Sequence, residues 1–240
     1  MQRNVLFDLD GTLLPMDMRN FIELYLKAFC QKFAHRLQIE PKRLVQGIWD
    51  GAAAMGKNDG DCLNREVFWR ALNNSCGKDM RQYEADFEEF YRNEFIAARK
   101  ATGVNPAAAK SVALLKKNGC RLIVATNPIF PKAATYTRIK WAGLDPDDFE
   151  YITVYDNCSY SKPNLNYYHE ICHFCGITPE ESIMVGNDVD EDMCAAKLGF
   201  DTYLITDCLI NRRDKDISRF KHGSFEEFYE WLVVKLRVES

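Results

Sequence analysis

The second half of the chain alternates helix-like and strand-like segments, and this alternation limits the possible folds more than any other feature of the sequence. From residue 105 onward, Pro and Gly bound the helix-like segments, and short continuous apolar runs lie between them. The runs that we expect to be strands are 120–126, 151–156, 182–186 and 201–206. Continuous apolar strands that alternate with helices indicate a parallel sheet covered on both faces. The expected fold class is therefore α/β, a Rossmann-like doubly wound parallel sheet.

Two helix starts in this half carry a capping-box pattern. Thr178 is followed three residues later by Glu181, and Ser224 is followed in the same way by Glu227. In a capping box the two side chains satisfy backbone N–H groups at the start of a helix. Only a short turn fits after Thr178, whereas Ser224 precedes a long amphipathic segment, so we expect a closing helix there.

The segment between the first strand and residue 100 differs from the rest of the chain. Residues 17 to about 99 show helical periodicity, and no clear strand interrupts them. A chain of 240 residues can form one large domain or two smaller ones. We expect a discontinuous α/β core of residues 1–15 and 98–240, with an all-helical insert of residues 16–97.

Composition gives no support to several classes of function, although an isolated local basic patch stays possible. The net charge is −4, so the chain lacks the basic character of a nucleic-acid-binding protein. No run approaches the roughly 18–20 apolar residues that a membrane span needs. The nine cysteines are odd in number and scattered, and Asp8 comes too early for a secretory signal peptide. We expect reduced thiols, a cytoplasmic location, and neither a nucleic acid nor a membrane as partner.

The first strand ends in two closely spaced carboxylates. The stretch VLFDLDGTLL, residues 5–14, places Asp8 and Asp10 one residue apart, just before a Gly. Asp-Gly is a common turn dipeptide, so this stretch alone is compatible with an ordinary turn. If it is instead a site, the repelling carboxylates require a cation and further polar partners elsewhere in the chain.

Polar residues of the required kinds follow the other expected strands. In open parallel α/β sheets, ligands bind beyond the carboxyl ends of the strands. The residues that follow the later strands are Thr126, Asn127, Lys162, Asn187, Asp188 and Asp192. One edge of the sheet therefore gathers carboxylates, a hydroxyl and a lysine from segments that are far apart in sequence.

Four of these segments together resemble the motifs of a known family. DLDGT, ATN, SKPN and GNDVDED occur in the order and placement of the four motifs of the haloacid dehalogenase superfamily, in its phosphatase branch. The helical insert directly after the first motif is similar to that family's helical cap of the early-insertion type. The resemblance spans residues 8 to 192 and covers the α/β part throughout.

The resemblance implies chemical roles for the two first carboxylates. Asp8 would be the nucleophile that forms an aspartyl-phosphate, and Asp10 would be the general acid and then the general base. Mg²⁺ would be the cofactor, since a carboxylate cannot easily approach a phosphate dianion. Its ligands would be the Asp8 and Asp188 carboxylates and the Asp10 backbone carbonyl.

The remaining motif residues would support these two. Thr126 and the Asn127 backbone would hold phosphoryl oxygens, and Lys162 would neutralise charge on the phosphate and on Asp8. Asp192 would position Lys162 or a metal-bound water, with Asn187 also behind the metal ligands.

The expected function is that of a Mg²⁺-dependent phosphatase acting on a small phosphorylated metabolite, as a monomer or a homodimer. Three alternatives stay open: a phosphomutase of the same superfamily, a metal-independent dehalogenase, and a non-catalytic binding protein. In the family, dehalogenases use the same nucleophile on carbon and in general lack the second aspartate.

The helical insert would select the substrate. Its most polar loop would face the leaving group, and loops carry function more often than cores do. The candidate contacts are Lys57 and Asn58, with Asp17 and Arg65 behind them.

Overall fold

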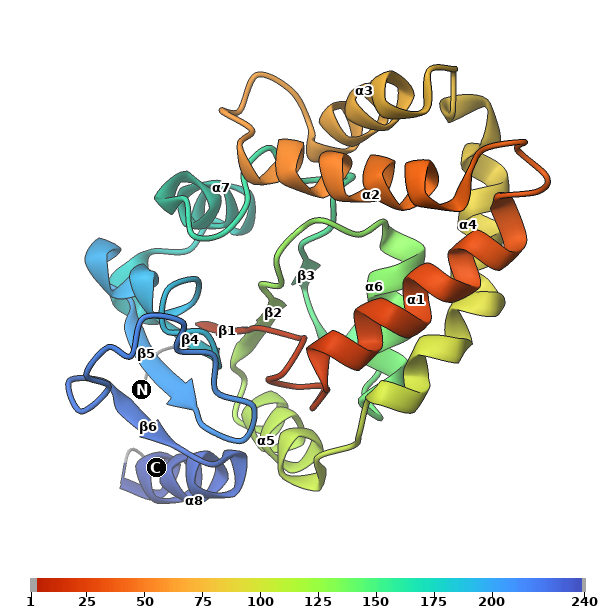
Figure 1. Cartoon of the computed structure of the whole chain (residues 1–240). Helices are drawn as coiled ribbons and strands as arrows, with labels where there is room; N and C mark the ends of the chain where they lie inside the picture. Colours follow the sequence, from red (N-terminus) through yellow and green to blue (C-terminus); the bar gives the residue numbers. More distant parts are fainter. Residues whose placement is uncertain (1–3, 239–240) are drawn as a thin grey trace.

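A six-stranded parallel sheet forms the centre of the molecule (Figure 1). The structure is a computed structural model that describes residues 4–238. The strands are β1 (Asn4–Phe7), β2 (Arg121–Val124), β3 (Tyr151–Ile152), β4 (Ser182–Gly186), β5 (Asp201–Ile205) and β6 (Lys221–Gly223). Their order is β3-β2-β1-β4-β5-β6, and every neighbouring pair is parallel. This confirms the doubly wound α/β class and places the topological switch point beside β1, where such folds bind ligands.

Helices cover both faces of the sheet because side chains alternate along each strand. Val5 and Phe7 belong to the hydrophobic cluster that includes α5 and α8, and Phe7 stacks on Phe225. Leu6 belongs to the cluster on the other face, with α7 and η5. The helices of the α/β part are α5 (Pro106–Lys117), α6 (Lys132–Trp141), α7 (Leu165–Cys175), α8 (Phe225–Val238), and the short η3 (Pro146–Asp148), η4 (Pro179–Glu181) and η5 (Met193–Leu198).

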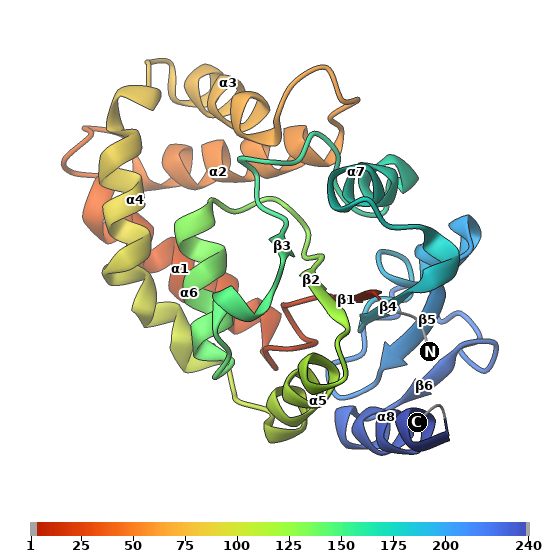
Figure 2. The same ribbon diagram turned by 180° about the vertical axis from the view of Figure 1, so that it is seen from behind.

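The segment between β1 and α5 is entirely helical, as expected, and lies to one side of the sheet (Figures 1 and 2). We call residues 16–97 the helical insert. Its elements, with η2 extending a little beyond it, are α1 (Met18–Phe33), α2 (Pro41–Gly56), α3 (Asn64–Cys76), η1 (Arg81–Tyr83), α4 (Glu84–Arg92) and η2 (Glu94–Ala101). Within residues 4–238, none of the helices has the length and apolar character that a membrane span requires.

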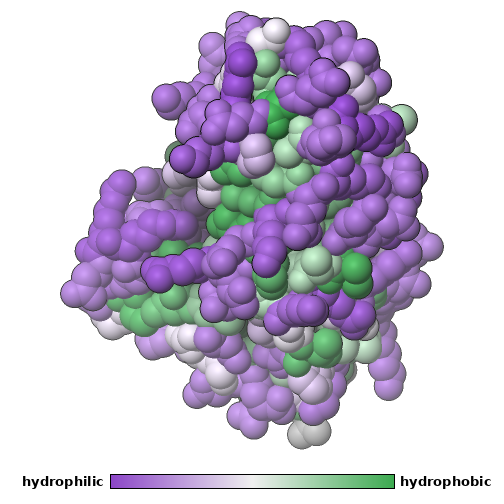
Figure 3. Space-filling view, turned by 45° about the vertical axis from the view of Figure 1, so that its right-hand side comes forward, coloured by the Kyte–Doolittle hydropathy of each residue, from purple (hydrophilic) through white to green (hydrophobic). Residues whose placement is uncertain are grey.

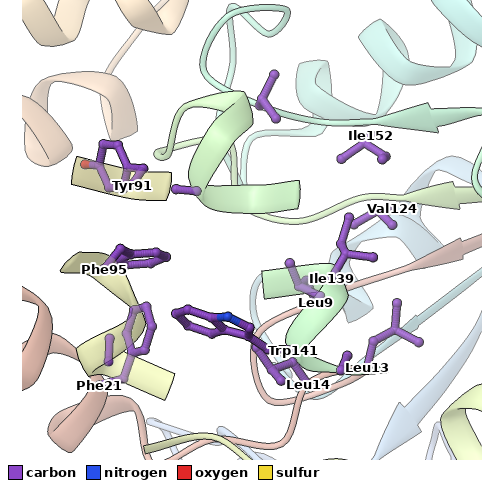
Figure 4. Close-up of a cluster of buried hydrophobic side chains, with 14 of the residues drawn as sticks. Leu9, Leu13, Leu14, Phe21, Tyr91, Phe95, Val124, Ile139, Trp141 and Ile152 are labelled. Atoms are coloured by element: carbon purple, nitrogen blue, oxygen red, sulfur yellow. The ribbon is translucent and has the colours of Figure 1, made fainter. Parts of the chain in front are cut away.

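The insert and the sheet share one hydrophobic core. Figure 4 shows this cluster, in which Phe21 and Phe95 from the helical elements approach Trp141 of α6. The rings of Phe95 and Trp141 stack with centroids 5.0 Å apart. On the sheet side the same cluster reaches Val124 and Ile152. This packing fixes the insert beside the carboxyl end of the sheet.

Three local expectations are wrong. The expected strand 151–156 is β3, only two residues long, because the Asn157 side chain bonds the Val154 N–H and the Ile152 carbonyl and turns the chain. Strand β6 was not predicted, because the sequence has no apolar run at that position. The Thr178 capping box does not form, because only a three-residue 3₁₀ turn follows and the Thr178 side chain caps no N–H.

Candidate active site

The carboxyl end of β1 places Asp8 in the interior of the molecule. Asp8 is only 7% exposed, and its Oδ2 accepts a hydrogen bond of 3.1 Å from the Thr12 hydroxyl. The chain then turns at Gly11, whose φ of +90° favours glycine. A Cβ on Gly11 would also come within 2.4 Å of the Asn187 side chain, so the turn is packed tightly against the loop after β4. The glycine in the first motif therefore permits the close approach of the first and fourth motifs.

Lys162 links Asp8 to Asp192. Its buried ammonium donates to Asp8 Oδ1 at 3.0 Å and to Asp192 Oδ1 at 2.5 Å. Burial lowers the pKa of Lys162, but the charges of Asp192 and Asp8 outweigh burial and hold this pKa well above its usual range. Burial raises the pKa of Asp8 against the opposing charge of Lys162. Burial also raises the pKa of Asp192, to about 6. The lysine therefore stays charged between two carboxylates.

The loop after β4 is folded around its own carboxylates. Asp192 Oδ2 accepts the backbone N–H of Asp188 at 2.9 Å. Asp188 Oδ1 accepts the backbone N–H groups of Asp190 and Glu191, at 2.8 and 3.0 Å. A Cβ on Gly186 would lie 2.2 Å from Asp192 Cγ, so only glycine fits there without displacing Asp192. This loop presents Asp188 Oδ2 to the site.

Arg138 is a buried partner of Asp10 that the sequence analysis did not include. Its NH1 donates to Asp10 Oδ2 at 2.5 Å, although the two residues are 128 positions apart. The Arg138 side chain is fully buried and stacks over the Phe130 ring at 4.3 Å. Burial raises the pKa of Asp10, and the charges of Arg138 and Lys162 oppose that rise. The buried face of α6 includes Thr135 and Arg138 beside Ala134, Ile139 and Trp141, so apolar periodicity in the sequence gives no signal that this arginine is buried.

Arg212 is the second cation missed by the sequence analysis. It lies beyond β5, in a polar stretch of sequence that no motif marks. Its NH1 donates to Asp188 Oδ2 at 2.5 Å, and its NH2 is 3.9 Å from Glu191. The Arg212 side chain is 57% exposed, so it reaches Asp188 from the surface.

Thr126 and Asn127 follow β2 and lie at the same edge of the sheet. Thr126 is buried, and its backbone carbonyl accepts the Tyr167 hydroxyl at 2.8 Å. Asn127 Nδ2 donates to Glu191 at 3.1 Å, while its buried Oδ1 has no hydrogen-bond partner among the described residues.

One cavity of about 300 Å³ unites most of the expected site residues. The expected residues that line it are Asp8, Asp10, Thr126, Asn127, Asn187, Asp188 and Asp192. Lys162 lies behind this wall, bonded to Asp8 and Asp192. The helical insert closes the other side of the cavity with side chains of α1, α2, α3 and α4.

The structure does not bring the four expected insert residues to this cavity. Asp17 caps α1 by accepting the Asn20 N–H, and Lys57 is exposed at the end of α2. Asn58 is buried in its own loop, where it donates to the Cys62 carbonyl and to Asn64. Arg65 pairs with Glu84 at 2.6 Å. The polar loop reaches the core elsewhere, because the Asn64 side chain bonds Pro128, Tyr160 and Ser161.

The residues at the end of the cavity formed by Asp8, Asp10 and Asp188 fit a hard divalent cation. Asp8 and Asp188 carboxylates line the same space, and Asp188 Oδ2 binds a cationic group there, the guanidinium of Arg212. Among the described residues, no backbone N–H reaches the carbonyl oxygen of Asp10. No group of three His, Cys, Asp or Glu side chains within residues 4–238 forms a metal cluster by itself. A site of two carboxylates and one carbonyl, completed by water and substrate, is the kind that suits Mg²⁺.

Comparisons with known proteins agree with this geometry. The family model described as haloacid dehalogenase-like hydrolase matches residues 2–199. No curated protein matches the chain. A phosphatase of this family from Thermococcus onnurineus is 20% identical, with a TM-score of 0.60 over 96% of this chain and 97% of its own.

Two further solved structures share the fold. A predicted phosphoglycolate phosphatase from Haemophilus somnus 129PT is 16% identical, with a TM-score of 0.55 over 96% of this chain and 97% of its own. The L-2-haloacid dehalogenase from Xanthobacter autotrophicus is 15% identical, with a TM-score of 0.58 over 97% of this chain and 99% of its own. The fold is therefore shared with proteins described as phosphatases and with a protein described as a dehalogenase.

Proposed function

Because this chain belongs to the haloacid dehalogenase-like hydrolase family, we propose that it is a Mg²⁺-dependent phosphatase. Its substrate would be a small phosphate monoester, hydrolysed through an aspartyl-phosphate on Asp8. Residues 1–15 and 98–240 would form the catalytic core, and the helical insert would act as the cap over the leaving group.

The observation that carries this proposal is the position of the Asp10 carboxyl group beside Asp8 in the cavity. Asp10 lines the same cavity as Asp8, and its buried Oδ1 has no hydrogen-bond partner among the described residues. Displacement of a halide from carbon needs no proton for the leaving group, whereas an alkoxide leaving from phosphorus does. Burial raises the pKa of Asp10 against the opposing charges of Arg138 and Lys162, which is the direction that suits a general acid. A second carboxyl in this place supports phosphoryl transfer.

In the first step the Asp8 carboxylate attacks phosphorus, and the bond from phosphorus to the ester oxygen breaks. Asp10 gives its proton to the departing oxygen, so that a neutral alcohol leaves. Lys162 stays bonded to Asp8 and offsets the negative charge that gathers beside it. The Thr126 hydroxyl and the Asn127 backbone would bind the phosphoryl oxygens.

In the second step the ionised Asp10 takes a proton from a water molecule. The water oxygen attacks phosphorus, the bond between phosphorus and Asp8 breaks, and inorganic phosphate leaves. Asp8, the Asp10 carbonyl and Asp188 would hold Mg²⁺, which supplies charge neutralisation between the nucleophile and the phosphate. Asp192, with Asn187 close by, would keep Lys162 and the loop of Asp188 in place.

The test is the release of inorganic phosphate from 4-nitrophenyl phosphate, measured with Mg²⁺ and after exhaustive chelation. Chloride release from 2-chloropropionate is measured in parallel. We expect phosphate release that depends on Mg²⁺ and no chloride release. Chloride release that survives chelation would replace this proposal with a dehalogenase.

A matched pair of variants separates metal binding from general loss of charge. Asp188→Asn should raise the Mg²⁺ concentration needed for half-maximal activity, because it removes a ligand. Asp190 lies on the same loop, but it pairs with Lys215 and is not part of the cavity wall, so Asp190→Asn is the control. It should leave the Mg²⁺ requirement unchanged, and equal shifts in both variants would contradict the ligand role of Asp188.

A further inference from the structure

We propose that the alcohol part of the substrate is apolar and carries no second negative charge, so that the substrates are monoesters of alkyl or aryl alcohols. This inference rests on the proposed phosphatase function. It concerns the end of the cavity that faces the helical insert, away from the carboxylates.

The insert lines its end of the cavity with hydrophobic side chains. Phe21 and Tyr25 come from α1, Ile48, Trp49 and Met55 from α2, and Phe87 from α4. On the face drawn in Figure 3, hydrophobic side chains gather in a recess bordered by hydrophilic ones. Concave sites lined by apolar and aromatic side chains, with a few placed polar groups, are typical of small-molecule binding.

Several polar groups near this end of the cavity are already paired with each other or with neighbouring side chains. The hydroxyls of Tyr25 and Tyr91 bond each other at 2.9 Å, so both residues present mainly ring surface. Glu84 accepts bonds from Arg65 and from the Trp69 ring nitrogen, at 2.8 and 3.1 Å. A sugar or polyol would therefore lose hydration of several hydroxyls here and find few partners in exchange, which is costly.

Among the described residues, the cavity wall formed by the insert offers no Lys or Arg to a second anion. Within residues 4–238, Arg212 is the one Lys or Arg side chain in the cavity wall, and it is held at the catalytic end by Asp188. Glu84 and Glu88 line the part formed by the insert and are both acidic. A carboxylate or second phosphate on the alcohol would be buried without a cation, which is strongly unfavourable.

The experiment compares alkyl phosphates whose leaving alcohols have similar intrinsic reactivity. The probes are butyl, hexyl and 2-phenylethyl phosphate, set against 4-carboxybutyl phosphate and glycerol 3-phosphate, with Mg²⁺ present. We expect kcat/KM to rise about fourfold for each added methylene until the cavity is filled. We expect the carboxylated ester to be slower than hexyl phosphate on the order of 100-fold.

Variants on α2 test whether the insert wall sets this preference. Trp49 is 46% exposed, so Trp49→Arg is compatible with folding and adds a cation to the wall. It should improve kcat/KM for 4-carboxybutyl phosphate and reduce it for hexyl phosphate. Ala53→Arg places the same charge on an exposed position of the same helix outside the cavity wall, and should leave both values unchanged.

The outcomes separate this inference from the proposed function. Phosphate release from all the esters with no preference for the apolar ones would overturn this inference and leave the phosphatase function in place. Faster turnover of glycerol 3-phosphate or of the carboxylated ester would do the same. Phosphate release from none of them would overturn both.

Discussion

Removal of the Arg138 guanidinium should destabilise the fold strongly, because this cation is the partner of a buried carboxylate. In Arg138→Met the apolar part of the side chain is kept, but the 2.5 Å bond to Asp10 and the stacking of the guanidinium on Phe130 are lost. Breaking a buried ion pair by removing one partner costs about 3–5 kcal/mol. The Asp10 side chain is 17% exposed and so keeps some contact with water, which places the expected cost near the lower limit, about 3 kcal/mol.

Asp10→Asn should reveal the same energetic coupling between Asp10 and Arg138, because it removes the charge of the other partner. Asp10→Asn leaves a fully buried guanidinium without its counter-charge, and Arg138 Nε is already without a partner among the described residues. The double variant removes both charges, so its cost should fall short of the sum of the single costs by about 2–3 kcal/mol.

Equilibrium unfolding in guanidinium chloride measures these costs as changes in the free energy of unfolding. The comparison requires that the slope of this free energy against denaturant concentration is the same in all variants. Arg36→Met is the matched control, since Arg36 pairs with Asp86 at 2.7 Å but its side chain is 51% exposed. Exposed pairs contribute about 0.2–1 kcal/mol, so the control should cost about that much. If Arg138→Met costs no more than Arg36→Met, the pair with Asp10 is not desolvated and the reasoning is refuted.

Three further predictions concern the site itself. Asp10→Asn should slow the hydrolysis of an alkyl phosphate roughly 10²–10⁴-fold, measured as phosphate release, because no acid protonates the alkoxide. Gly186→Ala should destabilise the protein by about 1–3 kcal/mol and reduce activity, because the new Cβ would lie 2.2 Å from Asp192. Gly56→Ala is the control, since nothing lies within 4 Å of the new Cβ, and it should stabilise the protein in the same unfolding assay. A loss of stability in Gly56→Ala would contradict this reasoning. Ca²⁺ in place of Mg²⁺ should support poor turnover in the phosphate-release assay, since its looser coordination does not fix the geometry of attack, and equal turnover would argue against a Mg²⁺ site.

Strands with strong local signals could be predicted from the sequence, whereas those that depend on distant contacts could not. Strand β4 matches the expected residues 182–186, because a buried parallel strand requires a continuous apolar run. The third strand was expected to be longer, since the side chain of Asn157 ends it through bonds that no periodicity reveals. The Ser224 capping box forms, with Glu227 accepting the Ser224 N–H, because a long helix follows it.

The same distinction holds in the candidate site. Asp8 and Asp188 could be placed at one cavity because strand ends meet at one edge of a parallel sheet. Arg138 could not, since its role arises from contact with a residue 128 positions away. The polar loop at Lys57 was expected over the substrate, but on the side of the insert the cavity wall is formed mostly by apolar helix faces such as that of Trp49. Such faces look like ordinary core in a sequence, because helix packing and pocket lining use the same residues.

In the proposed function the phosphate passes through a covalent bond to Asp8, and trapping this intermediate is the most direct test. Asp10→Asn is mixed with 4-nitrophenyl phosphate and Mg²⁺, quenched within milliseconds, and treated with hydroxylamine before peptide mass spectrometry. An aryl alcohol leaves with little help from an acid, but the variant lacks the base for hydrolysis, so the intermediate should accumulate. We expect the phosphate, or its hydroxamate product, on Asp8 and only when Mg²⁺ is present. Phosphate on another residue, or a wild-type rate of turnover in Asp8→Asn, would contradict the account.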